Sequence, residues 1–268
     1  MVREKGLPEK RVRGGRSDSG AQSGAQSGPQ GRPRGRPPGR TERGDATRAA
    51  LFEAAVLLMG EQGFEATTLR QIAAQAGVTH AVLYRYFPSK RAVVMELYRS
   101  LTEQLVTSVP TTQGNWRTRA VAATEASLEV LGPHRALLAS ATGVLVGVGD
   151  EGVFASATRT SRELVQGVFL EVVAGAKDCP RGERALVLGR SLDLLHLGII
   201  LFWLLDASPK QVATGALLKV LRKALPLVQT ALKLPGAWGL LGRLDGALQS
   251  GLMPAPAEVS RRGRSERT

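Results

Sequence analysis

The side chains best suited to chemistry lie in residues 63–90, GFEATTLRQIAAQAGVTHAVLYRYFPSK. This segment brings together threonine, tyrosine and serine hydroxyls, two guanidinium groups, an imidazole and an ammonium group. Such groups form hydrogen bonds with phosphate oxygens and base edges, and several of them carry positive charge. The chemistry that they favour is the recognition of a polyanion.

The spacing of apolar and capping residues predicts two short helices in this segment. Thr68 and Gln71 have the spacing of a capping box, in which each side chain bonds the other residue's backbone amide. Gly77 favours the left-handed conformation that ends a helix, and Thr79 can cap a second helix over 80–87. Two helices joined by a glycine turn form a helix-turn-helix unit, whose second helix enters the DNA major groove.

Over roughly residues 45–105 the sequence resembles the DNA-binding domain of the TetR family of bacterial repressors. The motifs are G-F-x-x-T-T, I-A-x-x-A-G-V, L-Y-x-Y-F and an S-K pair that opens a long fourth helix. The matching residues are Gly63, Phe64, Thr67, Thr68, Ile72, Ala73, Ala76, Gly77, Val78, Leu83, Tyr84, Tyr86, Phe87, Ser89 and Lys90. The resemblance implies an all-α protein. A three-helix helix-turn-helix domain would be joined by that long helix to a helical ligand-binding and dimerisation bundle.

The resemblance also implies which residues contact DNA. Base contacts fall to Arg70, His80, Ala81 and Val82, and phosphate contacts to Thr68, Tyr84, Arg85, Tyr86 and Lys90. Ala81 and Val82 offer only methyl groups, which contact thymine. Arg70 and His80 must therefore supply the polar discrimination, unless Arg70 is simply a solvated side chain at its helix start. Leu83 and Phe87 are expected to point into the core.

Positive charge is concentrated at the ends of the chain. The 268 residues carry a net charge of +13, and residues 1–44 hold eleven Lys and Arg against four Asp and Glu. Residues 1–44 contain few core-forming side chains, so we expect a disordered basic arm, and 251–268 a similar tail. Within the arm, Arg34-Gly35-Arg36 resembles an AT-hook core that lies in the minor groove of A·T-rich DNA. The alternative is a solvated tail that adds non-specific affinity.

Several classes of site receive no support from the sequence. Cys179 is the lone cysteine, which excludes an intramolecular disulfide and fits a reducing cytoplasm. The histidines His80, His134 and His196 lack metal-ligand spacing, and His196 is expected to be a helix-interface residue. No phosphate-binding glycine loop or nucleophile elbow is present. We therefore expect no enzyme, metal or cofactor. The apolar stretch Leu194–Leu205 is shorter than a membrane span, so we expect no membrane contact.

Helical periodicity continues through the rest of the chain. Residues 89–108 predict one long helix, and VPTTQGN (109–115) a break. Further helices are predicted at roughly 116–131, 133–148, 152–175, 183–206 and 209–233, with a weaker one at 237–250. Pro226 is expected to kink or shorten the helix over 209–233. We expect domains at 45–105 and 106–250, between the arm and the tail.

Two of these helices predict a homodimer. The stretch Leu197–Leu205 is apolar on every side, and such a helix must be covered on every side. A second copy of the chain can supply that cover, although both helices could instead be core helices of a monomer. The resemblance implies a four-helix dimer interface. The expected contacts are Leu197, Ile200, Trp203, Leu204, Leu217 and Val220.

Small side chains in residues 136–149, ALLASATGVLVGVG, leave room between helices. The resemblance implies a cavity there for a small apolar effector, while close helix packing is the alternative. Trp116, Phe154 and Phe169 are expected to be ordinary core residues. The leading hypothesis is a transcriptional repressor released from a palindromic operator by that effector. The alternatives are an effector-free architectural DNA-binding protein, or a scaffold or enzyme with a vestigial helix-turn-helix.

Overall fold

The computed structural model describes residues 42–109, 113–147 and 152–252. All regular elements within these ranges are helices, which confirms the all-α class. The predicted contacts Arg34 and Arg36 lie outside the described residues, as does most of the arm and of the C-terminal tail. The α-helices are α1 (Glu42–Gln62), α2 (Leu69–Gln75), α3 (His80–Tyr86), α4 (Lys90–Ser108), α5 (Trp116–Leu131), α6 (Arg135–Ser140), α7 (Thr142–Leu145), α8 (Arg159–Ala174), α9 (Glu183–Leu205), α10 (Val212–Ala231) and α11 (Ala237–Leu252).

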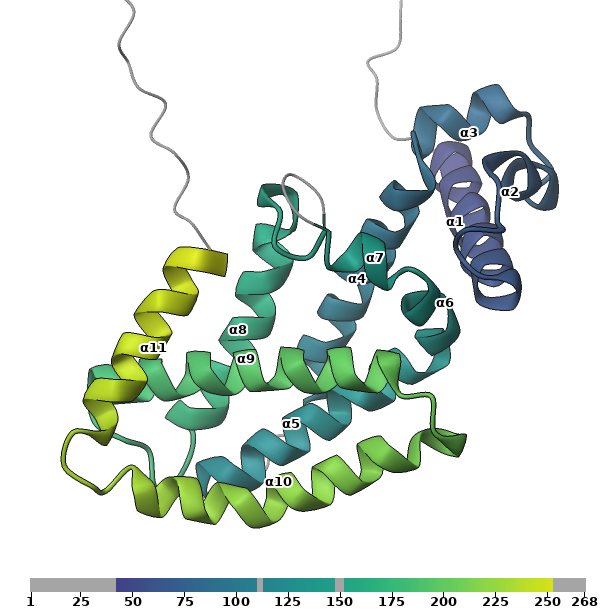
Figure 1. Ribbon diagram of the computed structural model, residues 1–268. Coiled ribbons are helices and arrows are strands. Elements are labelled where there is room, and N and C mark those ends of the chain that lie inside the picture. The colour runs from purple at the N-terminus through teal and green to yellow at the C-terminus, as the bar shows by residue number, and fades with distance from the viewer. Residues whose placement is uncertain (1–41, 110–112, 148–151, 253–268) are drawn as a thin grey trace, which may run out of the picture. The chain divides into compact units, whose positions relative to one another are not determined.

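Helices α1 to α3 form a small three-helix unit (Figure 1). Its core contains Leu51, Met59, Ile72, Leu83 and Phe87, all at most 2% exposed. Leu51 and Met59 lie eight residues apart on one face of α1, so their burial follows from helical periodicity. Leu83 and Phe87 point into this core, as the sequence predicts.

Helix α4 leads from the three-helix unit into the other helices (Figure 1). The Ser89 hydroxyl accepts a hydrogen bond from the amide of Ala92 at 3.1 Å, which caps its first turn. Its buried side chains pack against α1 and also against α5, α7 and α8, so α4 contributes to the core on both sides of the predicted domain boundary. Arg48 of α1 binds Glu96 of α4 at 3.0 Å. Hydrogen bonds from Arg99 and Arg48 lower the pKa of Glu96 to about 2.

The helix predicted over 133–148 is interrupted. A 3₁₀ turn (Gly132–His134) precedes α6, and the short α7 follows it. The Ser140 hydroxyl donates to the carbonyl of Leu137 at 2.8 Å, and the Thr142 hydroxyl donates to that of Ala139 at 2.8 Å. These side chains compete with the backbone amides for the same acceptors, which favours a helix end. The helix predicted from 152 likewise begins only at Arg159, after a 3₁₀ turn (Ser156–Thr158).

Helix α9 crosses the other helices and contacts α5, α6, α8, α10 and α11. Its most apolar 18-residue window has a mean hydropathy of 1.8, so by length and composition the helix could span a membrane. However, it carries the buried polar side chains Asp193 and His196 and packs on several helices, as core helices do.

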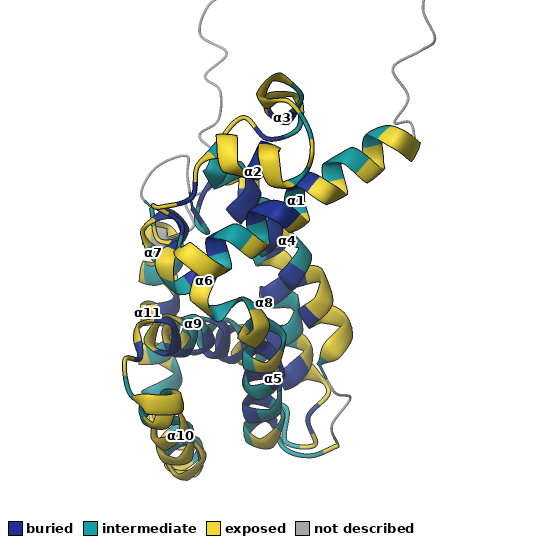
Figure 2. Ribbon diagram, turned by 90° about the vertical axis from the view of Figure 1, so that its right-hand side faces the viewer, coloured by how far each residue is buried: buried dark blue, intermediate teal, exposed yellow. Residues whose placement is uncertain are grey.

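Helix α10 contains Pro226 and continues past it to Ala231. Its exposed surface is extensive: only Thr214 and Leu225 are buried (Figure 2). Helix α11 is held on α9 by a charged pair, in which the guanidinium of Arg190 donates to both carboxylate oxygens of the buried Asp245.

The turn between α9 and α10 is built around Asp206. Its carboxylate accepts hydrogen bonds from the amides and hydroxyls of Ser208 and Thr214, at 2.6 to 2.9 Å. The bonds from Ser208 and then from Thr214 hold the pKa of Asp206 well below its ordinary value. Because these bonds favour the ionised form, they stabilise the folded chain above the unfolded pKa, near 3.9. That stabilisation is lost as the pH falls towards the folded pKa.

Replacing Asp206 with Ala should lower the melting temperature at neutral pH. The variant should also lose less stability on acidification than the parent, because the parent alone must protonate this carboxylate. Thermal denaturation followed by circular dichroism between pH 3 and 7 measures both effects. The exposed Glu129→Ala is the matched control, and it should leave the curve nearly unchanged. Equal curves for Asp206→Ala and the control would contradict this account of the turn.

Candidate nucleic-acid interface and internal cavity

The predicted contact residues share the outer surface of α2 and α3. Arg70, His80, Ala81, Tyr84 and Arg85 are exposed, as is Thr68. Val82 and Tyr86 are half-buried, and the latter packs on the core of the three-helix unit. The imidazole of His80 meets the ring of Tyr84 edge-on, with 4.7 Å between centroids. The surface therefore presents Arg70 near the start of α2, Arg85 near the end of α3, and the aromatic pair of His80 and Tyr84 on α3.

Local hydrogen bonds orient these two helices. The Thr68 hydroxyl accepts from the amide of Gln71, and the Gln71 carbonyl oxygen accepts from the amide of Thr68, so the predicted capping box is present. Gly77 has a φ of +66°, the left-handed value expected at the turn. Thr79 occupies the cap position of α3 but its side chain makes no capping hydrogen bond, so that part of the prediction is wrong.

Lys90 lies at the edge of this surface but is held by the protein itself. Its ammonium donates to the carbonyl of Phe64 at 2.6 Å and to that of Glu65 at 3.1 Å, and it sits 4.5 Å from the centre of the Phe64 ring. Two of its three donors are therefore used within the chain. This placement differs from the predicted phosphate contact: Lys90 ties the loop before α2 to the start of α4.

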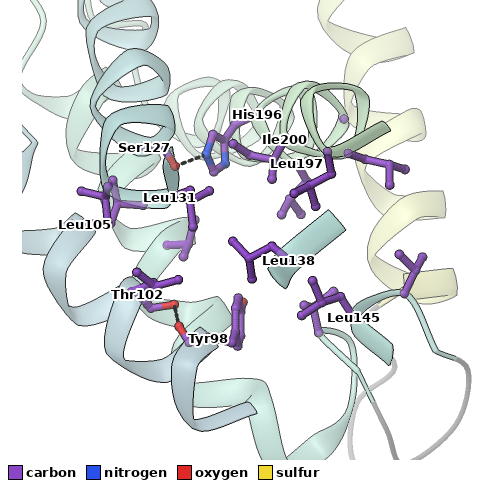
Figure 3. Close-up of a pocket in the computed structure, with 18 of the residues that line it drawn as sticks. Tyr98, Thr102, Leu105, Ser127, Leu131, Leu138, Leu145, His196, Leu197 and Ile200 are labelled. Atoms are coloured by element: carbon purple, nitrogen blue, oxygen red, sulfur yellow. Dashed lines mark hydrogen bonds between the residues drawn. The ribbon is translucent and has the colours of Figure 1, made fainter. Parts of the chain in front are cut away.

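A cavity of about 280 Å³ lies among the helices beyond the three-helix unit. It is close to the lower end of the roughly 300–1,000 Å³ typical of small-molecule sites. The predicted segment 136–149 contributes Leu138, Leu145 and Val146, but most of the lining comes from α4, α5 and α9 (Figure 3). The other residues that line the cavity are Tyr98, Leu101, Thr102, Leu105, Ser127, Val130, Leu131, Val153, Phe154, Val165, Leu194, His196, Leu197, Gly198, Ile200, Leu201 and Leu204.

Sequence reasoning missed most of these positions. Tyr98, Leu101, Thr102 and Leu105 have the i, i+3, i+4, i+7 spacing of one helix face, which marks the face as inward but not as bordering a void. Phe154, expected in the core, lines the cavity, whereas Trp116 and Phe169 are core residues, each at most 2% exposed.

Of the six predicted dimer contacts, Trp203 and Leu204 are buried inside the protomer, whereas Leu197 and Ile200 are half-buried. Leu197, Ile200 and Leu204 line the cavity, and Trp203 is 6% exposed. The guanidinium of Arg135 lies over the Trp203 ring and donates to the Trp203 carbonyl at 2.9 Å. The apolar side chains that these helices expose include Leu195, Phe202 and Leu205 on α9, and Val212, Val220 and Leu227 on α10. Leu217 is half-buried, and Val220 is 61% exposed.

Polar groups are few around the cavity. Nε2 of His196 lies 2.8 Å from the Ser127 hydroxyl oxygen, and its Nδ1 has no hydrogen-bond partner. Burial lowers the pKa of His196 to about 4, so the ring is neutral. Burial also raises the pKa of Tyr98 to about 12 and that of the neighbouring Asp193 to about 7. The Thr102 hydroxyl donates to the Tyr98 carbonyl at 2.9 Å (Figure 3).

Helix α6 connects the cavity with the three-helix unit. Leu138 lines the cavity, and two residues later the Ser140 hydroxyl oxygen accepts from the amide of Phe64 at 2.9 Å. Phe64 belongs to the loop that Lys90 also binds, directly before α2. A displacement of α6 would therefore reach the start of the candidate interface through a hydrogen bond.

In the ranges that the structure describes, no three His, Cys, Asp or Glu side chains converge as a metal site would require.

Residues 51–97 match the family described as bacterial regulatory proteins, tetR family. The sequence is 40% identical over 58 residues to the HTH-type transcriptional repressor KstR2 of Rhodococcus jostii, covering 22% of this chain and 28% of that protein. It is 41% identical over 58 residues to the HTH-type transcriptional regulator BetI of Rhizobium meliloti, covering 22% and 29%. The matched region thus spans less than a third of these curated relatives.

The fold extends the likeness beyond that region. A tetR-family transcriptional regulator from Streptomyces coelicolor superposes with a TM-score of 0.54 at 17% identity, over 76% of this chain and 89% of the other. At that identity the likeness concerns the fold alone. The match over residues 51–97, together with the three-helix unit and its capping box, assigns this part of the chain to the TetR family of bacterial regulatory proteins, and the remaining helices share the fold of that regulator.

Proposed function

We propose that this protein is a DNA-binding transcriptional repressor that leaves its operator when a small apolar molecule fills the cavity. The observation that carries the proposal is the pairing of an exposed helix-turn-helix surface with an internal apolar cavity, joined through α4 and α6. Two of the matched relatives are HTH-type transcriptional repressors, which supports repression rather than activation.

The exposed side chains define how DNA is read. Arg70 supplies a bidentate donor for guanine, and His80 adds one further polar contact. Ala81 and Val82 contact thymine methyl groups, while Tyr84 and Arg85 bind phosphates on either flank. Since Lys90 is held by carbonyls of the protein main chain, the contacts to DNA phosphates are made by Thr68, Tyr84 and Arg85 instead.

A symmetric dimer completes the site. The apolar side chains exposed on α9 and α10 include Phe202 at 42%, Leu205 at 65% and Val220 at 61%, and a second copy can cover them. Two-fold symmetric proteins read two-fold symmetric sites, so the operator is an inverted repeat. The half-sites lie about one helical turn apart or somewhat more, because both recognition helices must enter major grooves on the same DNA face.

Two structural links couple the cavity to DNA. Tyr98, Thr102 and Leu105 line the cavity from α4, whose first residues adjoin α3. Leu138 lines it from α6, which holds the Phe64 amide through Ser140. A ligand that favours a shifted position of either helix changes the separation of the two recognition helices. It lowers DNA affinity only by the difference in its affinity for the two states.

An architectural DNA-binding protein without an effector is the second candidate. The basic composition of residues 1–44, with Arg34 and Arg36, favours it. Such a protein would show weak sequence preference and a steep dependence of affinity on salt. Selection of binding sites from random DNA separates the two functions, since a repressor yields a compact palindrome.

Replacing Arg70 with Ala should weaken binding to the selected operator by about 1–3 kcal/mol and relax preference at one base pair per half-site. The reason is the loss of a bidentate base contact. Fluorescence anisotropy on operators mutated at each position measures the effect. Lys90→Met is the informative comparison: it should lower the melting temperature, because the loop loses its two hydrogen bonds, while leaving base preferences intact. Unchanged base preferences in Arg70→Ala would assign that side chain to the phosphate backbone.

Replacing Phe202 and Val220 together with Glu should convert a dimer into folded monomers, since the change places charges in the proposed interface. Sedimentation velocity gives the mass, and circular dichroism tests folding. Leu57→Glu is the matched control, because Leu57 is an apolar side chain of α1 that is 48% exposed and lies outside the proposed interface. A parent protein that sediments as a monomer at micromolar concentration would refute the dimer.

Replacing Thr102 with Phe should mimic an occupied cavity and lower operator affinity about tenfold, a typical coupling between sites. Adding Ser140→Ala should restore part of that loss, because the link to Phe64 is cut. Thr107→Phe, on the exposed side of α4, controls for the bulk of the ring. Binding is measured by anisotropy on the selected operator. A folded Thr102→Phe variant with parental affinity would favour the architectural protein.

A further inference from the structure

The lining of the cavity is mostly apolar, and at one end His196 and Ser127 form a polar pair. Figure 3 shows His196 and Ser127 together at one side of the cavity, and Tyr98 at the other. Among the described lining residues there is no Lys, Arg, Asp or Glu. A ligand group at the polar end therefore meets two neutral side chains, an imidazole and a hydroxyl.

The hydrogen bond between His196 and Ser127 leaves this pair able to bind one more polar group. If Nε2 carries the proton, it donates to the Ser127 oxygen, and the Ser127 hydroxyl remains a free donor while Nδ1 remains an acceptor. If Nδ1 carries the proton, Ser127 donates to Nε2, and Nδ1 becomes the free donor. Either tautomer offers one donor and one acceptor, so the pair suits a hydroxyl or a carbonyl equally well.

The environment of the pair opposes an ionic group. His196 is 3% exposed, and Nδ1 is a buried polar atom without a partner, which costs free energy until something binds it. The same burial holds the imidazole neutral, since it lowers its pKa to about 4. A carboxylate in this position would lose its hydration without gaining a cation, which is costly. An ammonium would find no carboxylate among the lining residues. The pKa of about 7 leaves the neighbouring Asp193 partly protonated at neutral pH, so it is a weak counter-ion.

We propose that the cavity binds an uncharged amphiphile, with a hydroxyl or carbonyl head held by His196 and Ser127 and an apolar body packed among Leu131, Leu138 and Ile200. The Thr102 hydroxyl donates to a carbonyl of its own helix, so it has no hydrogen left to donate to a ligand. This inference rests on the proposed effector role, but the binding itself can be measured without DNA.

Four probes with the same chain length test the proposal: 1-decanol, 2-decanone, decanoate and decylammonium. Isothermal titration calorimetry on the full-length protein at pH 7.5 should give dissociation constants at least tenfold lower for the alcohol and the ketone than for either ion. His196→Phe keeps a ring against Phe169, whose centroid lies 4.7 Å from that of His196. It should weaken the alcohol and the ketone roughly tenfold, the worth of a neutral hydrogen bond or two.

Ser127→Ala is the milder second variant if His196→Phe does not fold. It should reduce the preference for the alcohol and the ketone over the two ions. Ile200→Ala is the matched control in the apolar part of the cavity, and it should weaken all bound probes alike. Tighter binding of decanoate, tighter binding of decylammonium, or binding of none of the four would each overturn the proposal. So would an alcohol affinity that both polar variants leave unchanged.

Operator binding measured in parallel separates this inference from the proposed function. An alcohol that binds through His196 but leaves operator affinity unchanged would support the inference and contradict the effector role. A protein that selects a palindrome but binds none of the probes would retain its DNA-binding function and lose the ligand class proposed here.

Discussion

One continuous apolar face on α4 joins the halves of this molecule. Val93, Val94, Leu97 and Leu101 belong to the hydrophobic cluster shared with the three-helix unit, and Leu105 belongs to the cluster formed with α5, α8 and α9. Because interiors are closely packed and resist compression, a shift at one end of such a helix is carried to the other. The helix-turn-helix is therefore attached to the remaining helices through side-chain packing rather than through a flexible linker.

The cavity interrupts that packing on the same face of α4. An unfilled volume deprives the surrounding side chains of contacts and costs about 24 cal/mol per Å³ in cores where it has been measured. A ligand recovers part of this free energy, so occupancy and packing are linked. The orphan Nδ1 of His196 adds a polar group whose cost is likewise removed by a suitable ligand. The cavity is thus both a place where the packing is incomplete and the place where a bound ligand would stabilise the fold.

Helix α6 is short, but hydrogen bonds at both of its ends link it to distant parts of the chain. Arg135 at its start donates to the carbonyls of Trp203 and Asp206 at the end of α9, and Ser140 at its end holds the amide of Phe64. The helix is thereby tied to the turn before α10 and to the loop before α2. With Leu138 in the cavity wall, it contacts three regions that the proposed function requires to communicate.

The sequence alone was sufficient for several features that depend on local rules. The capping box at Thr68, the left-handed Gly77 and the inward Leu83 and Phe87 follow from spacing and backbone sterics, so they were predictable. The length of α4 and the exposure of Arg70 and His80 follow in the same way.

Other features depend on contacts between residues far apart in the chain. Periodicity marked Trp203 and Leu204 as apolar but did not say whether a second copy or Arg135 and the protomer core would cover them. It could not show that Lys90 binds the carbonyls of Phe64 and Glu65, 26 and 25 residues away. Nor could it pair His196 with Ser127, which lies 69 residues earlier. Local conformation was set by neighbouring residues, whereas the cavity, its polar end and the faces left uncovered were decided only when the helices packed together.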